Sequence, residues 1–349
     1  MNAARSFLTL AVGALALVLA GPPHPPARAQ AQAQPAADAS FEGYVQVLAA
    51  RARAEGVSER TIQAVIPGLT YNPRVVALDR SQPGISPTPP PVAGYLRTHV
   101  NPQRIARGRD KRSVHAAILP GIEQRYGVPA KMLLAIWGHE TNYGSYMGDF
   151  DLARSLATLA FDGRRRELFA GEFIAVLKII DQGVPRARLT GSWAGAFGHP
   201  QFLPSVYLRL AVDGDGNGTR DLWTSEVDTL ASIANYFRDA GWRAGEPWGV
   251  AARIPDSFSR ATVETRLKPE SCSRVHARHS QWKPVSQWRA LGIQPLGPIA
   301  DDTLATLFEP DGPGTRAWLL TGNYRVILQY NCSNYYALSV GLLADEIAR

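Results

Sequence analysis

Cysteine is scarce in this 349-residue chain, which contains only Cys272 and Cys332. Neither residue has a histidine or a second cysteine at metal-ligand spacing, so the sequence gives no support for a thiolate metal centre. Two cysteines late in a chain that enters an oxidising compartment are a natural disulfide pair. Two separate buried thiols remain the alternative at this point.

Long apolar runs are also missing, apart from residues 7–20 (FLTLAVGALALVLA). This run is too short to span a bilayer, follows Arg5 and precedes the sequence Ala27-Arg28-Ala29, which has the pattern of a cleavage site. We expect residues 1–29 to be a secretory signal peptide, with a retained N-terminal anchor as the alternative. No cysteine lies directly after this run, where a lipid would be attached, so a lipoprotein anchor is not indicated. The mature protein is expected to be a soluble periplasmic monomer with no stable membrane insertion.

A strong excess of one charge is absent as well. The chain has 37 Lys and Arg against 30 Asp and Glu, and residues 1–29 hold two arginines and no acid, which leaves 35 − 30 = +5. The only basic triplet is 164–166, and no dense basic cluster is interleaved with aromatic residues. Nucleic-acid binding is therefore not expected, whereas mild basicity suits an acidic polymer.

Helical periodicity dominates what is present, which predicts a mainly α (α+β) fold without internal repeats. Residues 30–40 form a low-complexity lead expected to be disordered. We expect an N-terminal helical segment over 41–91, a main helical body over 92–242, a small Trp- and Pro-rich lobe over 243–322 and a C-terminal segment over 323–349 that returns to the main body. Helices are expected at 41–65, 92–126, 154–161, 166–181, 226–240 and 333–347. A further helix is expected to start at the Gly-Val-Pro break (127–129) and to carry Met132, Leu133, Ile136 and Trp137. The Pro-rich segment 82–91 should be extended, and short strands are expected at 248–254 and 324–328.

The sharpest chemical feature is Glu140, in the segment Ala-Ile-Trp-Gly-His-Glu-Thr. It lies four residues after Ile136 and seven after Leu133, on the apolar stripe of its own helix. Desolvation there should raise its pKa, as a general acid requires near neutral pH. The alternative is a glutamate at a helix end that hydrogen-bonds to backbone or to an arginine. His139 should face away or be structural, because adjacent helical residues do not share a face.

Two further segments have a composition suited to carbohydrate. Residues 191–205 (GSWAGAFGHPQFLPS) are rich in small residues, which let a ligand approach the backbone closely. Ser192 and Gln201 could hydrogen-bond to sugar hydroxyls or acetamides, and Phe202 could stack on a sugar face. A tight loop around a packed aromatic side chain is the alternative. Residues 330–336 (YNCSNYY) alternate aromatics with amides, a weaker indication on its own.

Residues 213–221 (DGDGNGTRD) match the opening of a calcium loop, with oxygen ligands at positions 1, 3 and 5 and glycine at position 6. Thr224 stands at position 12, where glutamate is usual, so Glu226 or Asp228 would close a longer loop. The alternative is a Gly-rich turn that binds no metal.

Taken in order, these motifs resemble the lytic murein transglycosylase B family from about residue 41 to the end. The resemblance implies a lysozyme-like helical catalytic core flanked by smaller lobes, with a substrate groove. It implies cleavage of the MurNAc–GlcNAc β-1,4 bond of peptidoglycan without water, giving 1,6-anhydro-MurNAc ends. The segments that carry the resemblance are 127–129 (GVP), 140–144 (ETNYG), 157–161 (ATLAF), 164–166, 191–205, 213–221, 235–237 (NYF) and 330–338 (YNCSNYYAL).

The resemblance also assigns roles to residues. Glu140 matches the single catalytic acid/base, and no cofactor is needed for the chemistry. A structural Ca²⁺ site would consist of Asp213, Asp215, Asn217, the Thr219 carbonyl and Asp228. Substrate-binding positions are Ser192, Gln201, Phe202, Arg165, Arg166, Tyr236, Tyr330, Asn331, Tyr336 and Tyr95.

The chain departs from the family pattern in two places. Leu203 stands where methionine is common, and the 223–228 loop is one residue longer. A bond between Cys272 and Cys332 would tie the Trp-rich lobe to the groove wall. A hydrolytic muramidase is the rival enzyme and would need a second carboxylate, for which Asp149 and Asp151 are the nearest candidates. A non-catalytic peptidoglycan-binding protein is the rival of another class.

Overall fold

The computed structural model describes residues 27–82, 90–265, 269 and 272–349. Most of the expected signal peptide and of the Pro-rich 82–91 segment lies outside these residues. The described chain forms two compact units, each assembled from separated segments. Among the described residues, unit 1 comprises those within 90–143 and 230–349, and unit 2 comprises 27–82 and 144–229. None of the helices in the described part is both long enough and apolar enough to cross a membrane.

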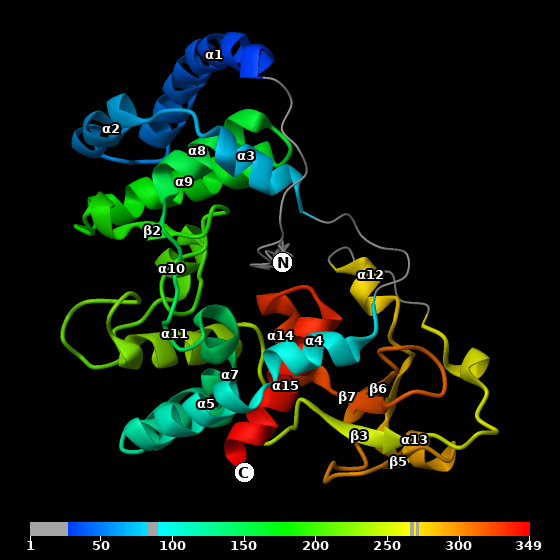
Figure 1. Cartoon of the computed structure of the whole chain (residues 1–349). Helices are drawn as coiled ribbons and strands as arrows, with labels where there is room; N and C mark the ends of the chain where they lie inside the picture. Colours follow the sequence, from blue (N-terminus) through cyan, green and yellow to red (C-terminus); the bar gives the residue numbers. More distant parts are fainter. Residues whose placement is uncertain (1–26, 83–89, 266–268, 270–271) are drawn as a thin grey trace, which may run out of the picture. The chain divides into compact units, whose positions relative to one another are not determined.

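Unit 2 is built on α8 (Leu152–Asp162) and α9 (Arg166–Asp181), which pack against each other and against α1 (Figure 1). Capping residues fix where its helices begin. Asp151 accepts from the Arg154 amide at the start of α8, and Ser58 accepts from the Thr61 amide at the start of α2. The remaining elements are α1 (Ala27–Ala54), α2 (Glu59–Val65), a 3-10 turn (Ile66–Gly68), α3 (Pro73–Arg80), the antiparallel pair β1 (Phe150–Asp151) and β2 (Thr190–Gly191), a 3-10 turn (Arg186–Arg188), α10 (Pro204–Leu210) and the start of α11 (Glu226–Asp239).

The helices of unit 1 gather around α15 (Asn334–Ala348), which packs on α4, α5, α7 and α14. Its residues from Ala337 to Val340 are all buried, and so is most of α7. The C-terminal segment therefore does return to the helices around α7, as expected. The other helices are α4 (Val92–His99), α5 (Pro102–Val114), α6 (Leu119–Tyr126), α7 (Ala130–Thr141) and α14 (Gly322–Tyr330).

The remainder of unit 1 is a five-stranded antiparallel sheet of order β4-β6-β7-β3-β5. It has a hydrophobic core of its own, in which Val285, Trp288, Ile293 and Leu319 are fully buried. Strands were expected in this stretch, and the one at 248–254 is present as β3. The elements are β3 (Gly249–Arg253), a 3-10 turn (Arg260–Val263), α12 (Ser273–His276), β4 (Trp282–Pro284), α13 (Val285–Ala290), β5 (Gln294–Pro295), β6 (Leu304–Phe308) and β7 (Ala317–Leu320).

Three expectations about elements are wrong. Residues 30–40 lie within α1 rather than in a disordered lead, because Ala and Gln are strong helix formers. Residues 324–328 belong to α14, not to a strand. Their β-branched residues favoured a strand, but the Thr321 cap and the burial of Tyr324, Ile327 and Leu328 along one face outweigh that local preference. Residues 92–126 form three helices, since Asn101 caps a new helix with Pro102 in its first position.

Candidate active site

Glu140 lies in the last turn of α7, and the end of that helix is fixed by its own sequence. Asn142 adopts a left-handed conformation (φ 49°) and its amide donates to the Gly138 carbonyl, which closes the helix. The chain then folds back so that a Cβ on Gly138 would lie 2.6 Å from the Tyr143 ring. Glycine at position 138 is therefore required for the turn that holds Glu140 at the helix end.

The Glu140 carboxylate is partly accessible, and its surroundings perturb it strongly. Desolvation raises its pKa to about 7, against a smaller lowering effect of the hydrogen bond from Tyr336. In that bond the Tyr336 hydroxyl donates to Glu140 Oε1 at 2.5 Å. The carboxyl group is thus protonated in a large fraction of molecules near neutral pH, as the position of Glu140 on the apolar stripe predicted.

Tyrosines from four other helices, α4, α11, α14 and α15, form a cluster at this carboxyl group. Burial raises the pKa of Tyr330 and Tyr336 well above the usual value and that of Tyr95 to about 12, and the charge of Glu140 adds to each shift. The Tyr236 ring packs 4.8 Å from that of Tyr330, and its hydroxyl donates to the Gln329 carbonyl at 2.8 Å. Unit 1 therefore brings the predicted tyrosines together with Glu140.

Asn331, the remaining predicted residue of this unit, ends α14 beside Tyr330. Its amide donates to the Ile327 carbonyl, and its side chain is partly exposed. It thus lies at the edge of the tyrosine cluster.

Sequence reasoning missed the layer of side chains behind Tyr336. His139 Nε2 lies 3.0 Å from Ser339 Oγ, and its ring contacts those of Tyr336 (5.2 Å) and His99 (5.4 Å). Burial, with the nearby Arg104 and His99, lowers the pKa of His139 well below its usual value, so this imidazole is neutral. His139 is structural, as expected. The signal for Ser339 was its place three residues after Tyr336, one turn along the same helix face.

In unit 2, the 191–205 loop is held by its own backbone. Ser192 Oγ accepts from the Ala196 amide at 3.0 Å, and the Ser192 amide donates to the Ala196 carbonyl at 2.7 Å. Gln201, at φ 50°, donates through Nε2 to the carbonyls of Met147 (3.1 Å) and Gly198 (3.0 Å). A Cβ on Gly198 would lie 2.7 Å from the Leu222 carbonyl oxygen. Packing within the protein therefore requires glycine at this position, whether or not a ligand approaches the backbone.

Phe202 differs from its expected role as a stacking surface. Its side chain is only 2% exposed, and its backbone pairs with that of Phe197. The packed aromatic side chain, the alternative interpretation of this loop, is what the structure contains.

The predicted substrate-binding arginines, Arg165 and Arg166, also contact other residues of the protein. Arg164 and Arg165 both contact the buried Asp79 at 2.6 Å. Burial raises the pKa of Asp79, but the hydrogen bonds from the two arginines outweigh it and leave the pKa below its usual value. Arg166 lies 4.9 Å above the Tyr44 ring and donates to the Phe161 carbonyl. These contacts join α3 and α1 to the start of α9, a structural role that the sequence did not indicate.

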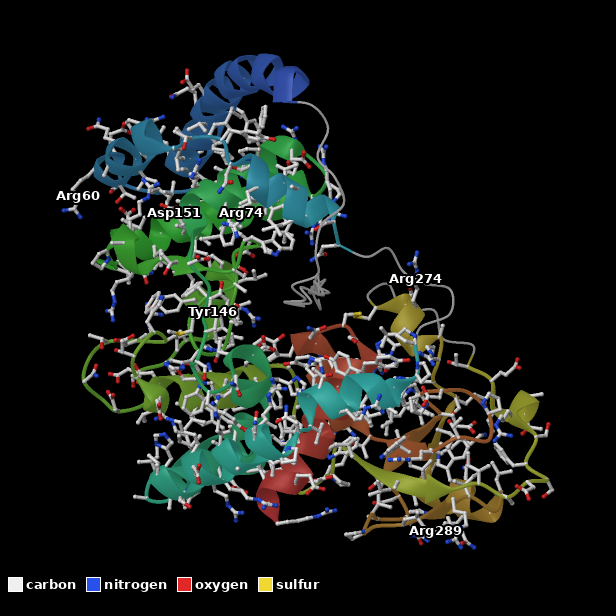
Figure 2. The ribbon with its side chains drawn as sticks, viewed as in Figure 1. Arg60, Arg74, Tyr146, Asp151, Arg274 and Arg289 are labelled. Carbon is white, nitrogen blue, oxygen red and sulfur yellow. A yellow bond between two sulfur atoms is a disulfide. The ribbon has the colours of Figure 1, made fainter. Side chains whose placement is uncertain are left out.

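The carboxylates considered for a hydrolase are engaged in similar ways. Asp151 caps α8 and pairs with Arg186 at 3.0 Å, and Asp149 accepts from the Tyr146 hydroxyl at 3.5 Å. Asp151 and Tyr146 are labelled in Figure 2. Glu172, a further buried acid whose pKa burial raises, accepts from the Ser205 amide and hydroxyl at the start of α10. All three have structural partners in unit 2.

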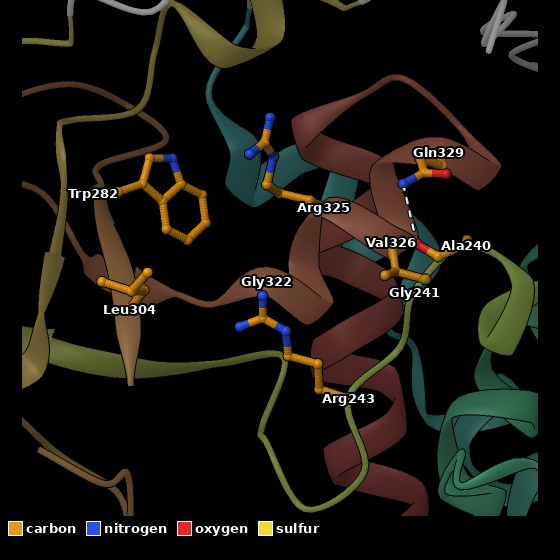
Figure 3. Close-up of a pocket in the computed structure, with 9 residues that line it drawn as sticks. All are labelled: Ala240, Gly241, Arg243, Trp282, Leu304, Gly322, Arg325, Val326 and Gln329. Carbon is orange, nitrogen blue, oxygen red and sulfur yellow. Dashed lines mark hydrogen bonds between the residues drawn. The ribbon is translucent and has the colours of Figure 1, made fainter. Parts of the chain in front are cut away.

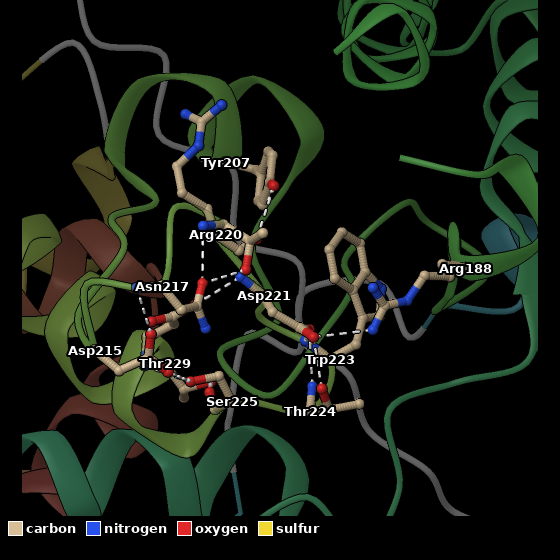
Figure 4. Close-up of polar contacts among 12 residues, drawn as sticks. Arg188, Tyr207, Asp215, Asn217, Arg220, Asp221, Trp223, Thr224, Ser225 and Thr229 are labelled. Carbon is tan, nitrogen blue, oxygen red and sulfur yellow. Dashed lines mark hydrogen bonds and ion pairs between the residues drawn. The ribbon is translucent and has the colours of Figure 1, made fainter. Parts of the chain in front are cut away.

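The predicted calcium loop brings its carboxylates together, since ligand atoms of Asp213, Asp215 and Asp228 lie within 4.8 Å of one another. Figure 4 shows polar contacts of Asp215, Asn217 and Asp221 in this loop. Asp228 is fully buried on α11, while Thr224 is turned away and donates to Asp221. Burial raises the pKa of Asp228, and the charge of Asp215 adds to this shift.

The donor chemistry of this loop fits a hard cation. Backbone amides of Gly216 and Gly218 donate to Asp213, and a cation would balance the remaining repulsion among the three acids. An all-oxygen set is what Ca²⁺ prefers. Asn217 shapes the loop, since its side-chain oxygen accepts from the Thr219 amide at 2.8 Å. Of the two acids considered for closing the loop, Asp228 is the one whose carboxylate lies beside those of Asp213 and Asp215.

Cys272 and Cys332 form the expected disulfide, which joins the start of α12 to the turn between α14 and α15. Asn334 strengthens the same connection: its Nδ2 donates to the Val275 carbonyl at 3.0 Å and its Oδ1 lies 2.8 Å from His279 Nε2. The segment between Tyr330 and Tyr336 is thus anchored to the residues before the sheet's edge strand β4.

Comparison with known proteins gives consistent matches over this chain. Residues 40–345 match the family described as Transglycosylase SLT domain. The chain is 32% identical over 284 residues to membrane-bound lytic murein transglycosylase B of Escherichia coli K12, covering 78% of this chain and 73% of that protein.

Solved structures agree with this match. SltB3 of Pseudomonas aeruginosa in complex with NAG-anhNAM-pentapeptide is similar with a TM-score of 0.79 and 40% identity, over 88% of this chain and 79% of that one. The Escherichia coli lytic transglycosylase Slt35 in complex with calcium is similar with a TM-score of 0.70 and 27% identity, over 89% and 93%.

Proposed function

Since the chain belongs to the transglycosylase SLT domain family and is a lytic transglycosylase of peptidoglycan, we propose that Glu140 is its single acid and base. The observation that carries this proposal is the desolvated carboxyl group with a pKa of about 7, held by the Tyr336 hydroxyl. A group with that pKa can give a proton and take one back at neutral pH. The fold is similar to that of solved lytic transglycosylases, with TM-scores of 0.79 and 0.70.

One carboxyl group is enough because the substrate supplies its own nucleophile. Ordinary glycosidases need two carboxylates, about 5–10 Å apart depending on the stereochemical outcome. Here protonated Glu140 gives its proton to the oxygen that links MurNAc to GlcNAc, and the bond from C1 to that oxygen breaks. The 2-acetamido group of MurNAc stabilises the charge that develops at C1.

The second step closes the ring and restores the acid. Ionised Glu140 takes the proton from the C6 hydroxyl of the same MurNAc, and that oxygen bonds to C1 to give the 1,6-anhydro end. The attack is intramolecular, so no entropy is lost in bringing a second reactant to the site. The hydrogen bond from Tyr336 stabilises the ionised form of Glu140 between the two proton transfers.

Binding of the sugars falls to the polar and aromatic groups described above. In this proposal the partly exposed Ser192 and Gln201 hold acetamide and hydroxyl groups, and the tyrosines around Glu140 bind the sugars near the scissile bond. Ser192 is the candidate for the acetamide. Phe202 and Arg165 act by shaping their unit, since each is packed or paired within it. Arg166, whose side chain is exposed, is proposed to bind carboxylates of the substrate.

The ends of the released products test this function. Purified sacculi treated with the protein should release fragments ending in 1,6-anhydro-MurNAc, identified by mass spectrometry as lacking one water relative to reducing ends. Reducing ends would instead identify a hydrolytic muramidase. Binding to sacculi without release would leave the non-catalytic interpretation.

Calcium is proposed as a structural ion held by Asp213, Asp215, Asn217, the Thr219 carbonyl and Asp228. Saturating Ca²⁺, at ~100 times its dissociation constant, should stabilise the protein by about 2.7 kcal/mol through binding to the folded state alone. Differential scanning calorimetry with EDTA, Ca²⁺ and Mg²⁺ measures this as a rise in Tm specific to Ca²⁺. Asp215→Asn should abolish the rise, whereas Asp302→Asn, an exposed acid in unit 1, should retain it. No Ca²⁺-dependent shift in the wild type would refute the site.

The site of action is proposed to be the periplasm, reached by export and with the enzyme as a monomer. Two features support this placement: the N-terminal sequence has the pattern of a signal peptide, and the Cys272–Cys332 bond requires an oxidising compartment.

A further inference from the structure

A cavity of about 460 Å³ lies in unit 1, on the face of α14 that does not carry Tyr324, Ile327 and Leu328 (Figure 3). Four residues of α14 line it: Gly322, Arg325, Val326 and Gln329. Their spacing of three, four and seven residues places them along one side of the helix. The cavity is therefore walled by a complete helical stripe.

The facing wall is the sheet. Trp282 of the edge strand β4 and Leu304 of β6 line the cavity from that side. In the register Trp282 pairs with Thr306 and Pro284 with Leu304, so Trp282 and Leu304 are diagonal neighbours. Leu304 is 46% exposed, a large apolar side chain left open to solvent. The chain after α11, from Ala240 to Arg243, completes the lining.

Two guanidinium groups give this cavity its charge. Arg325 lies 5.5 Å from the centre of the Trp282 ring, and among residues 27–82, 90–265, 269 and 272–349 no carboxylate pairs with it. The guanidinium of Arg243 pairs with Glu246 at 3.4 Å, and 61% of the Arg243 side chain is exposed. When the flat face of a guanidinium group packs on an aromatic ring, the N–H groups along its edge stay available. They can bind a carboxylate through two hydrogen bonds.

We propose that this cavity binds a carboxylate-bearing part of the peptidoglycan stem peptide, an inference that rests on the proposed function and deepens it. Arg325 and Arg243 bind the carboxylates, while Leu304 and Val326 contact the apolar parts of the peptide. A sugar ring is a poorer occupant, because the guanidinium of Arg325 already covers the Trp282 ring. The apolar lining with a few convergent polar groups is typical of a small-ligand site.

The cavity adjoins the tyrosines of the active site through α14. Gln329 lines the cavity and is followed directly by Tyr330, and the Gln329 carbonyl accepts from Tyr236. From Gly322 to Tyr330 the helix rises ~12 Å. A pentapeptide spans up to ~17 Å when extended. A stem peptide on a MurNAc near Tyr330 can thus reach along the whole helical stripe.

The test compares glycan strands that carry stem peptides with the same strands after an amidase has removed them. Arg243→Gln/Arg325→Gln should raise KM for the peptide-bearing strands ~10-fold or more, through loss of charge-assisted hydrogen bonds. The kcat on both substrates and KM for bare strands should stay within about twofold. Arg289→Gln, at an exposed arginine of the same unit that pairs with Asp301, is the matched control and should change nothing (Figure 2).

Calorimetric titration with the isolated stem pentapeptide separates this inference from the proposed function. The wild type should bind the peptide and the double variant should bind it at least ~10-fold more weakly. If the wild type does not cleave the strands but binds the pentapeptide more tightly than the double variant does, the proposed function is wrong and the peptide site is supported. An unchanged KM for peptide-bearing strands, an equal rise for bare strands, or equal peptide affinity of the two proteins would overturn the site.

Discussion

Replacing Glu140 with Gln is expected to lower kcat on peptidoglycan about 10⁴-fold, at the upper end of what one general acid/base contributes. Glutamine keeps the size of the side chain and can still accept a hydrogen bond from Tyr336 through its amide oxygen. It cannot give a proton to the glycosidic oxygen or take one from the C6 hydroxyl. Release of soluble fragments from sacculi, followed over time, measures the loss.

Stability separates a chemical effect from unfolding in this experiment. The variant should keep or exceed the wild-type Tm, because it removes a desolvated ionisable group. Glu167→Gln, at a side chain that is 83% exposed, is the matched control and should keep full activity. The wild-type kcat should fall as pH rises through about 7, since the protonated form of Glu140 is lost there. Activity of the Glu140 variant within tenfold of wild type would exclude it as the acid/base.

Removing the disulfide with Cys272→Ser/Cys332→Ser is expected to lower the free energy of unfolding by about 4 kcal/mol. That value follows from the entropy which a loop of 60 residues regains in the unfolded chain. Urea unfolding followed by tryptophan fluorescence measures the change. The turn that contains Cys332 lies between Tyr330 and Tyr336, so kcat should fall together with stability.

The single variants provide the control. Each cysteine replacement breaks the same bond, so either one alone should destabilise the protein about as much as both together. Reduction of the wild type should reproduce the effect and leave the double variant unchanged. A loss below ~1 kcal/mol in the double variant would show that the hydrogen bonds of Asn334 anchor this turn without the disulfide.

Local sequence signals predicted α7 and the raised pKa of Glu140, and for a clear reason. The Gly-Val-Pro break sets the start of the helix, and the spacing of Leu133, Ile136 and Glu140 sets the buried face. Because Glu140 lies on this buried face of α7, its burial and raised pKa could be predicted without knowledge of distant contacts. Helix α9 was predicted over its full length on the same grounds, because its apolar periodicity is continuous from Arg166 to Asp181.

Local sequence signals could not predict contacts between residues that are far apart in the chain. Nothing near Glu140 indicates Tyr336, its partner 196 residues later. The pairing of Asp79 with Arg164 and Arg165 joins segments 85 residues apart, so the arginines could be interpreted only as free for substrate. For α14, the β-branched residues favoured a strand, and only its packing in the folded unit makes it a helix. The cavity on α14 could not be predicted for that reason.

The separation of Glu140 from Tyr336 has a consequence for the timing of activity. At a synthesis rate of ~5–20 residues per second, the 196 residues between them take roughly 10–40 s to make. Throughout that interval the growing chain carries Glu140 without the Tyr336 hydroxyl that stabilises its ionised form. A chain cut before α15 never acquires that hydroxyl. In the proposed mechanism, the hydrogen-bonded pair of Glu140 and Tyr336 is therefore complete only when nearly the whole chain has been made and folded.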